Sequence, residues 1–234
     1  MIFITLTTSG YIEYTLNCLQ SLDKIGLSGR LLTYCIGREG YEILKKNGYP
    51  CEWIDNEEYS EFVSFYAPRW SNVTYHKFLI LYENLKKHDY VCITDGDIVF
   101  ENPEFLNYLS ENMGDHDLLI QSDSISEESD ENGLCSGFMF LRSNPVTLAI
   151  FDPKVMESQK DNQTWEDQQY INHVKHSLKY KRLPLHLFPN GQYYYEHHAS
   201  IQPYLIHFNW VVGHEKKKKM KAYKKWSVKH ITPV

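Results

Sequence analysis

The stretch Tyr90-Val91-Cys92-Ile93-Thr94-Asp95-Gly96-Asp97-Ile98-Val99-Phe100 joins two apolar runs through a pair of carboxylates separated by one glycine. The first run is short and rich in β-branched residues, which predicts a buried strand. Asp95 and Asp97 would then lie at or just past its carboxyl end, where open α/β sheets place their ligands. Two acids beside an apolar strand are costly to bury unless a positive group neutralises them. Because hard oxygen ligands suit Mg²⁺ or Mn²⁺, the stretch predicts a divalent-cation site.

Strand-like and helix-like segments alternate along the rest of the chain, which indicates an α/β protein with a mostly parallel sheet flanked by helices. The predicted strands are 2–6, 31–36, 51–54, 90–94, 118–121, 137–141, 185–188 and 204–208. The predicted helices are 11–25, 41–47, 74–87, 104–111, 146–156 and 164–178. Residues 37–40 form a predicted turn and 56–69 an irregular segment, and lysines fill a tail at 216–229. No repeat or linker interrupts the pattern, so we predict one domain over residues 1–234.

Composition narrows the class of protein. A net charge of -6 argues against general nucleic-acid binding. The five cysteines are scattered and form no Cys-x-x-Cys pair, which indicates reduced thiols rather than a zinc site or a disulfide framework. The sequence starts directly with a strand-like run, and no run is long and apolar enough for a bilayer crossing. We therefore expect a soluble, cytoplasmic chain.

A histidine near the end of the sequence could complete the cation site. His207 ends the apolar run Leu205-Ile206-His207 and would be a third ligand beside two carboxylates, most suitably for Mn²⁺. Alone, such a histidine is more often a hydrogen-bonded core residue, and it is the acid pair that favours the ligand role. Gly213-His214-Glu215-Lys216 follows, and its lysine could bind a phosphate group.

Two interpretations remain open for the segment Trp165-Glu166-Asp167-Gln168-Gln169. Asp167 follows Thr164 by three positions, the arrangement typical of a helix N-terminal cap. Alternatively, the start of the helix directs Asp167 and Gln168 into an active site, where they could hold sugar hydroxyls and support developing positive charge. The Ser- and acid-rich segment 122–133 is similarly open, as a solvated surface loop or as a substrate lid.

Taken together, the segments resemble the GT-A-fold nucleotide-diphospho-sugar transferases of glycosyltransferase family 77 and, more distantly, of family 8. The resemblance rests on five motifs in order, namely Tyr75-His76-Lys77-Phe78, the stretch around Asp95 and Asp97, Ser136-Gly137-Phe138-Met139-Phe140-Leu141-Arg142-Ser143, Asp167-Gln168 and the segment from His207 to Lys216. Two departures stand out. Cys135 occupies a position where relatives often have asparagine, and the insert between His207 and Gly213 is longer than in family 8.

The resemblance implies a GT-A fold with a Rossmann-like mixed sheet, and metal-dependent transfer of a sugar from a UDP-sugar to a glycan or other hydroxyl acceptor with retention of configuration. It implies Mn²⁺ or Mg²⁺ on Asp95, Asp97 and His207. It places donor contacts at Thr7, Thr8, Tyr11, Lys77, Asp95, Gly96, Ser136, Gly137, Gly213 and Lys216. Of these, Thr7, Thr8 and Tyr11 would hold the nucleoside, with the Tyr11 ring stacked on the base. The catalytic candidates are Asp123, Asp167 and Gln168, and Asp123 or Asp167 would be the base if the enzyme were inverting.

Three alternatives remain at the level of the sequence. The stretch 93–99 also resembles the nucleophile motif of haloacid-dehalogenase-type phosphohydrolases, although no later acidic motif fits that class. A non-catalytic module could bind the sugar nucleotide without turnover. The lysine run could hold the chain peripherally on anionic lipid, or it could be a solvated tail with Lys216 alone facing the diphosphate. The donor sugar, the acceptor and the oligomeric state have no signal in the sequence.

Overall fold

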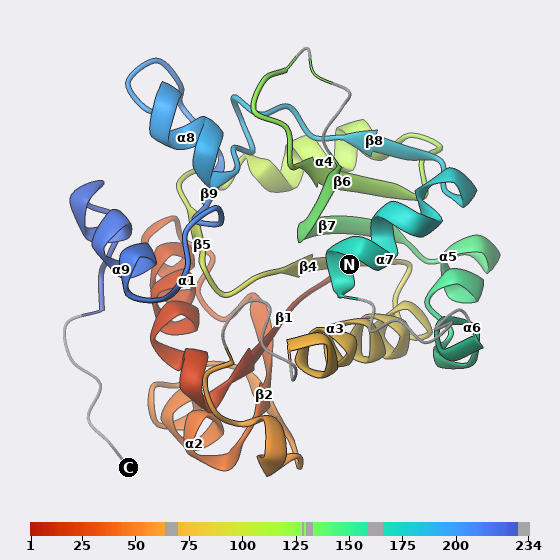
Figure 1. The fold of residues 1–234 in the computed structure, drawn as a ribbon, viewed down its shortest axis with the longest axis horizontal. Coiled ribbons are helices and arrows are strands. Elements are labelled where there is room, and N and C mark those ends of the chain that lie inside the picture. Colours follow the sequence, from red (N-terminus) through yellow and green to blue (C-terminus); the bar gives the residue numbers. More distant parts are fainter. Residues whose placement is uncertain (64–69, 128, 130–132, 159–165, 229–234) are drawn as a thin grey trace.

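The computed structural model describes residues 1–63, 70–127, 129, 133–158 and 166–228. Within these ranges one sheet has the strand order β3-β2-β1-β4-β7-β6-β8 (Figure 1). Its strands are β1 (Ile2–Thr8), β2 (Leu31–Ile36), β3 (Cys51–Ile54), β4 (Tyr90–Thr94), β6 (Leu118–Ser122), β7 (Leu134–Arg142) and β8 (Tyr180–Arg182). All neighbours pair in parallel except β7, which is antiparallel to both β4 and β6. The predicted α/β fold, with a mixed and mostly parallel sheet, is confirmed.

Helices cover both faces of the sheet, so successive strand residues enter different cores. Phe3 and Cys92 pack on the face that holds α1 (Ile12–Lys24), α2 (Arg38–Lys46) and α4 (Phe105–Met113). Their neighbours Ile4, Val91 and Ile93 pack on the other face. That face holds α3 (Trp70–Leu85), α5 (Pro145–Ile150), α6 (Pro153–Ser158) and α7 (Asp167–Val174). This double burial explains why β4 is an uninterrupted apolar run.

A short second sheet pairs the segment that follows β4 with a segment near the end of the sequence. Asp95 N donates to the Gly137 carbonyl at 2.8 Å, so β7 holds the residue that follows β4. The chain then enters β5 (Ile98–Phe100), which pairs antiparallel with β9 (Leu205–His207). In that register Ile98 lies opposite His207. The pairing therefore places His207 beside the two acids that precede β5.

Several predicted elements differ in their bounds, and two predictions were wrong. The helix expected at 146–156 is split into α5 and α6, because Pro153 lacks the N–H that a continuous helix needs and starts α6 instead. The strand expected at 185–188 is a turn in which Leu187 N and Phe188 N both donate to the Pro184 carbonyl. The missed elements in this region are β8 and α8 (Gly191–His197).

Three helices also begin at other residues than predicted. The turn predicted at 37–40 belongs to α2, which begins at Arg38. The helix expected at 74–87 begins four residues earlier, at Trp70. The helix expected at 164–178 is α7 followed by the 3-10 turn Lys175–Ser177. Its proposed cap, Thr164, lies outside the described residues, as do parts of the segments 56–69 and 122–133.

The lysine run forms helix α9 (Gly213–Ala222) rather than an irregular tail. Four of its seven described lysines pair with acids of this chain: Lys216 with Asp97, Lys217 with Glu13, Lys218 with Glu215 and, beyond the helix, Lys225 with Glu101. This pairing favours the structural interpretation of the run, and lipid contact stays a prediction. No helix in the described part of the chain combines the length and apolar character that a membrane crossing requires.

Candidate active site

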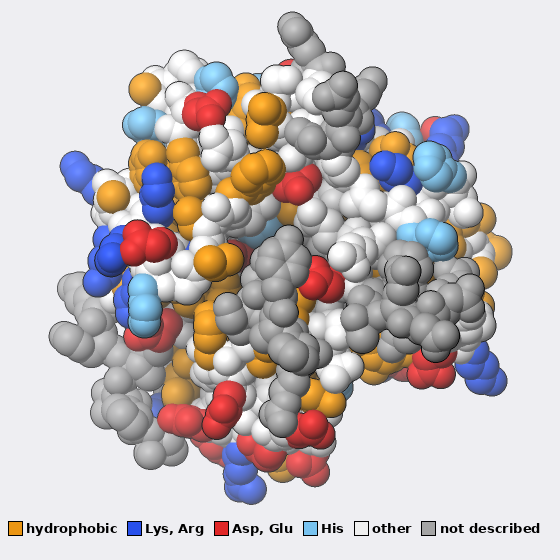
Figure 2. All heavy atoms as spheres, in the orientation of Figure 1, with side chains coloured by type: hydrophobic (Ala, Val, Ile, Leu, Met, Phe, Trp, Pro, Cys, Tyr) orange, Lys and Arg blue, Asp and Glu red, His pale blue; other side chains and the backbone are white. Residues whose placement is uncertain are grey.

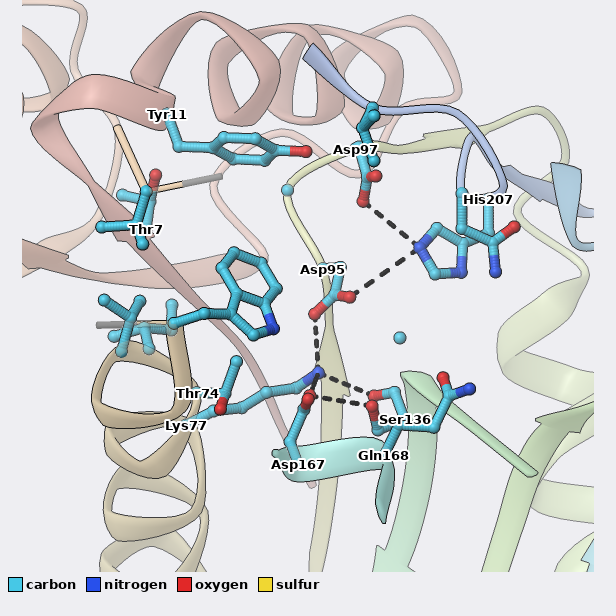
Figure 3. A pocket seen from close by; sticks show the side chains of 18 of the residues that line it. Thr7, Tyr11, Thr74, Lys77, Asp95, Asp97, Ser136, Asp167, Gln168 and His207 are labelled. Carbon is cyan, nitrogen blue, oxygen red and sulfur yellow. Dashed lines mark hydrogen bonds and ion pairs between the residues drawn. The ribbon is translucent and has the colours of Figure 1, made fainter. Parts of the chain in front are cut away.

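Asp95, Asp97 and His207 form a compact cluster at the carboxyl end of β4 (Figure 3). One ligand atom of each lies within 4.8 Å of those of the other two. His207 Nε2 lies 3.3 Å from Asp97 Oδ1 and 3.8 Å from Asp95 Oδ2. Asp97 and His207 are buried, whereas Asp95 is partly open to the cavity. Two carboxylates and one imidazole are a donor set that suits Mn²⁺ or Mg²⁺, so the three residues fit the predicted metal.

Gln121, a residue that the sequence analysis missed, fixes the imidazole. This fully buried side chain uses its Nε2 to donate to the carbonyls of Phe188 and Pro189, both at 3.0 Å. Its Oε1 must then be the atom 2.8 Å from His207 Nδ1. A carbonyl oxygen can only accept, so Nδ1 carries a proton and Nε2 is the nitrogen that faces the acids. A metal-binding histidine commonly gains its orientation from such a partner.

Gly137 leaves room for the imidazole ring of His207. A Cβ atom at this position would lie 2.1 Å from His207 Cε1, which no real contact allows. The resemblance implied a contact between Gly137 and the donor. Gly137 does line the cavity, and the structure adds that its missing side chain is what makes room for His207.

Lys216 approaches the cluster from α9. Its ammonium group pairs with Asp97 and donates to the Tyr11 hydroxyl at 3.0 Å. Burial would raise the pKa of Asp97, but Lys216 and then His207 outweigh it and hold that pKa well below its usual range. Burial would lower the pKa of His207, but Asp97 raises it to about 10. The buried carboxylate is thus neutralised by the chain's own cations.

Lys77 is the centre of a second network of buried hydrogen bonds, which lies on the other side of Asp95. Its Nζ donates to Asp95 Oδ1 at 2.6 Å, Asp167 Oδ2 at 2.8 Å and the Ser136 carbonyl at 2.8 Å. Ser136 Oγ also donates to Asp167 Oδ2, at 2.8 Å. Burial lowers the pKa of Lys77, yet Asp167 and then Asp95 raise it above its usual value. Although burial would raise the pKa of Asp167, Lys77 and Ser136 lower it.

This network shows which way the side chains of the segment 165–169 face, and the catalytic role of Asp167 and Gln168 stays a prediction. In the described residues Glu166 is the N-cap of α7, and its side chain and that of Gln169 form the capping box. Asp167 instead faces Lys77. Figure 3 shows Asp167, Ser136 and Gln168 together on one side of Asp95, with Asp97 and His207 on the other. The segment therefore contributes to the site rather than only to the helix end.

Asp123 and Gln168 meet at the edge of this group. Gln168 Nε2 donates to Asp123 Oδ2 at 2.9 Å, and Trp210 Nε1 donates to Asp123 Oδ1 at 3.0 Å. Burial raises the pKa of Asp123, and these two hydrogen bonds oppose the shift. This bond turns the amide nitrogen of Gln168 toward Asp123, and its Oε1 has the capacity to accept from a ligand in the cavity.

Most of these groups line one cavity of about 380 Å³. Its lining includes all but two of the predicted site residues: Thr7, Thr8, Tyr11, Lys77, Asp95, Gly96, Asp97, Ser136, Gly137, Asp167, Gln168, His207 and Lys216. Asp123 is tied to the lining through Gln168 and Trp210. Gly213 instead lines a smaller adjoining hollow with Tyr11 and Lys216. Figure 2 shows one face of the molecule, with hydrophobic and acidic side chains close together near its middle.

Aromatic rings cluster at the end of the cavity where a nucleoside was expected. The Tyr11 ring stacks on Tyr14 with centroids 4.6 Å apart and lies 18° from the plane of Phe62, with centroids 6.0 Å apart. Thr7 and Thr8 lie in the same lining, and Figure 3 places Thr7 and Tyr11 on one side of the cavity. The base stacking implied for Tyr11 would therefore involve a group of rings rather than one isolated tyrosine.

Comparisons with known proteins agree on one class. The sequence profile of the nucleotide-diphospho-sugar transferase family matches residues 28–222. A Dictyostelium discoideum protein described as UDP-galactose:fucoside alpha-3-galactosyltransferase is 24% identical over 89% of this chain, and the chain spans about 40% of that relative's length. The solved galactosyltransferase LgtC, with donor and acceptor sugar analogs, superposes with a TM-score of 0.64 at 12% identity over 98% of both chains. Mouse xyloside xylosyltransferase 1 gives a TM-score of 0.57 at 13% identity over 89% of this chain and 97% of its own.

Proposed function

Because the chain belongs to the nucleotide-diphospho-sugar transferase family, with a GT-A fold, and is a glycosyltransferase, we propose that it transfers a sugar from a UDP-sugar to a hydroxyl of a glycan acceptor with the aid of a divalent cation. The observation that carries this proposal is the convergence of Asp95, Asp97 and His207 within 4.8 Å, flanked by Lys216 and Lys77. The Dictyostelium relative's description makes UDP-galactose the first donor to test.

The charges in the cavity suit departure of a diphosphate. As the bond between the anomeric carbon and the β-phosphate oxygen breaks, negative charge builds on the leaving nucleoside diphosphate. A cation bound by the two acids and His207 would neutralise part of that charge. Lys216 lies beside the same ligands and beside Tyr11, so its ammonium group would add a fixed positive charge near the diphosphate.

Polar groups on the other side of Asp95 suit the sugar. The anomeric carbon gains positive character, and Gln168 Oε1 is the oxygen free to support it because Nε2 is held by Asp123. The acceptor oxygen forms the new bond to that carbon, and its proton leaves with the nucleoside diphosphate. Lys77 and Ser136 would orient the sugar by fixing Asp167.

Retention is the stereochemistry that this arrangement favours. An inverting enzyme needs a carboxylate free to take the acceptor's proton. Asp167 is bound to Lys77 and Ser136, and both oxygens of Asp123 accept hydrogen bonds from Gln168 and Trp210. Protonation of Asp167 would remove the charge that pairs with the buried Lys77, and protonation of Asp123 would weaken the two hydrogen bonds that it accepts. Attack from the side of the departing diphosphate needs no protein base.

The test is a donor screen with Mn²⁺, in which nucleotide release is measured with and without a panel of glycoside acceptors. We expect slow release from one UDP-sugar, faster release when an acceptor is present, and loss of both with EDTA. Product anomers resolved by NMR would establish retention. Phosphate release from simple phosphomonoesters would support the phosphohydrolase alternative instead, and tight donor binding without any turnover would support the non-catalytic module.

A further inference from the structure

Trp210 lies at the rim of the cavity. Trp210 is 51% exposed, although its indole ring is one of the largest apolar groups in the chain. It lines the cavity together with Gln168 and with Val212, which is 58% exposed. Large apolar side chains gain free energy by burial, so an exposed pair at a cavity rim indicates a surface that a ligand covers.

The backbone of Trp210 is strained. Its φ is 63°, a left-handed value that is a true outlier for a bulky residue and costs on the order of 1 kcal/mol or more. Asn209 holds this turn in place because its Oδ1 accepts from Gly191 N at 2.6 Å and its carbonyl accepts from the Tyr195 hydroxyl at 3.3 Å. A Cβ at Gly191 would lie 2.2 Å from the Asn209 carbonyl oxygen. Helix α8 thus fixes the conformation that turns the indole toward the cavity.

The indole is also tied to the catalytic group. Its N–H donates to Asp123, and the same carboxylate accepts from Gln168. Asp123 therefore sets the position of the ring relative to the amide that faces the sugar. With its N–H bonded inward, the ring offers a ligand its flat apolar face, and the adjoining polar groups lie at one edge of that face.

We propose that the indole face of Trp210 is the platform on which the pyranose ring of the acceptor stacks. This inference rests on the proposed glycosyl transfer. A pyranose has an apolar face of C–H groups and a rim of hydroxyls, which matches an indole face bordered by Asp123 and Gln168. The strain at Trp210 is maintained because the ring conformation is needed there.

The acceptor, rather than the donor, fits this position. The groups that suit the nucleotide, Tyr11 and Lys216, and the three metal ligands lie inside the cavity. Trp210 lies at the solvent edge, where the second substrate can arrive after the donor has bound. A sugar stacked on it would direct a hydroxyl toward Gln168 and thus toward the anomeric carbon.

The experiment compares Trp210→Ala and Trp210→Phe with the unchanged chain, using the active UDP-sugar, Mn²⁺ and methyl glycosides of galactose, glucose, fucose and xylose as acceptors. Trp53→Ala is the matched control, because Trp53 is 40% exposed but lies on β3. We expect Trp210→Ala to raise the acceptor KM about tenfold or more, equivalent to about 1.4 kcal/mol. Trp210→Phe should keep most of the affinity, and the loss of transfer by Trp210→Ala should exceed its loss of donor hydrolysis.

Three outcomes would count against the inference. An acceptor KM for Trp210→Ala within twofold of the unchanged chain would overturn it, as would equal use of acyclic polyols and pyranosides. Absence of nucleotide release from every UDP-sugar in the unchanged chain would overturn the proposed function and this inference with it. Saturation-transfer NMR adds a readout independent of turnover, since the C–H face of a bound methyl glycoside should receive saturation in the unchanged chain and lose it in Trp210→Ala.

Discussion

Gln121 Oε1 lies 2.8 Å from His207 Nδ1, and this contact determines which nitrogen of the histidine faces the acidic pair. The amide cannot rotate to offer its NH₂ group, because both hydrogens are used by the Phe188 and Pro189 carbonyls. The atom of His207 that faces the acids is thus set by the backbone of a neighbouring loop, through one buried glutamine.

Replacing this glutamine should weaken metal binding. We expect Gln121→Leu to lower the Mn²⁺ affinity about 10- to 100-fold, the usual effect of losing such a partner, measured by isothermal titration calorimetry with UDP present. Asn190→Leu is the matched control, because Asn190 is equally buried and donates to the Ser122 and Ser124 carbonyls. Asn190→Leu should lose stability but keep its Mn²⁺ affinity. Equal affinity in both variants would show that Gln121 has no orienting role.

Removing a ligand should remove the activity. We expect Asp97→Ala to reduce kcat/KM for the active donor about 100- to 1,000-fold, comparable to the loss of one preorganised electrostatic group in other enzymes. In the unchanged chain EDTA should abolish turnover and added Mn²⁺ should restore it. If Asp97→Ala kept metal-dependent hydrolysis of every active donor, the metal-site assignment would be wrong.

A methyl group at Gly137 should displace His207. The added Cβ would lie 2.1 Å from the ring, so we expect Gly137→Ala to destabilise the fold by about 1–3 kcal/mol, measured by urea denaturation. The same change made in a His207→Ala background should cost much less, because the clash is gone. Equal costs in the two backgrounds would contradict the proposed contact.

The buried Lys77–Asp167 pair predicts a pH dependence of stability. The pKa of Asp167 is lowered in the folded chain, so its contribution is present above the unfolded pKa of about 3.9 and is lost as the pH falls through the lower folded value. We therefore expect Asp167→Asn to reduce the free energy of unfolding at pH 7, with the difference shrinking below about pH 4. Asp115→Asn is the control, because Asp115 pairs with Lys179 at the surface and should change stability little. A difference for Asp167→Asn that is the same at pH 7 and pH 3 would exclude this origin.

The features that were predicted best from the sequence are those that depend on residues adjacent in the chain. The apolar run of β4 and the acids that follow it are adjacent in the chain, so both the strand and the cation site follow from neighbouring residues. The function of Asp167 in the helix predicted at 164–178 was harder to interpret. A carboxylate at the start of a helix can either cap the helix or face an active site. The cap at Glu166 and the contact with Lys77 show which way Asp167 faces, and its catalytic role stays a prediction.

Features that depend on distant contacts could not be predicted in the same way. The strand predicted at 204–208 contains β9, but β5 has only three residues, too few for a periodic pattern, and the pairing of β5 with β9 joins segments about one hundred residues apart. Gln121 gave a weak signal, as a polar residue within an apolar strand. Trp210 gave none, since no local rule places a tryptophan at positive φ.

The antiparallel pairing of β5 with β9 has a consequence for synthesis. Until His207 and Lys216 have left the ribosome, Asp97 in the growing chain has neither the imidazole nor the ammonium group with which it pairs. Because long-range pairings form late in folding, the nascent chain should be unable to use its donor even when the large sheet is assembled. Catalytic competence would thus be acquired in one late step.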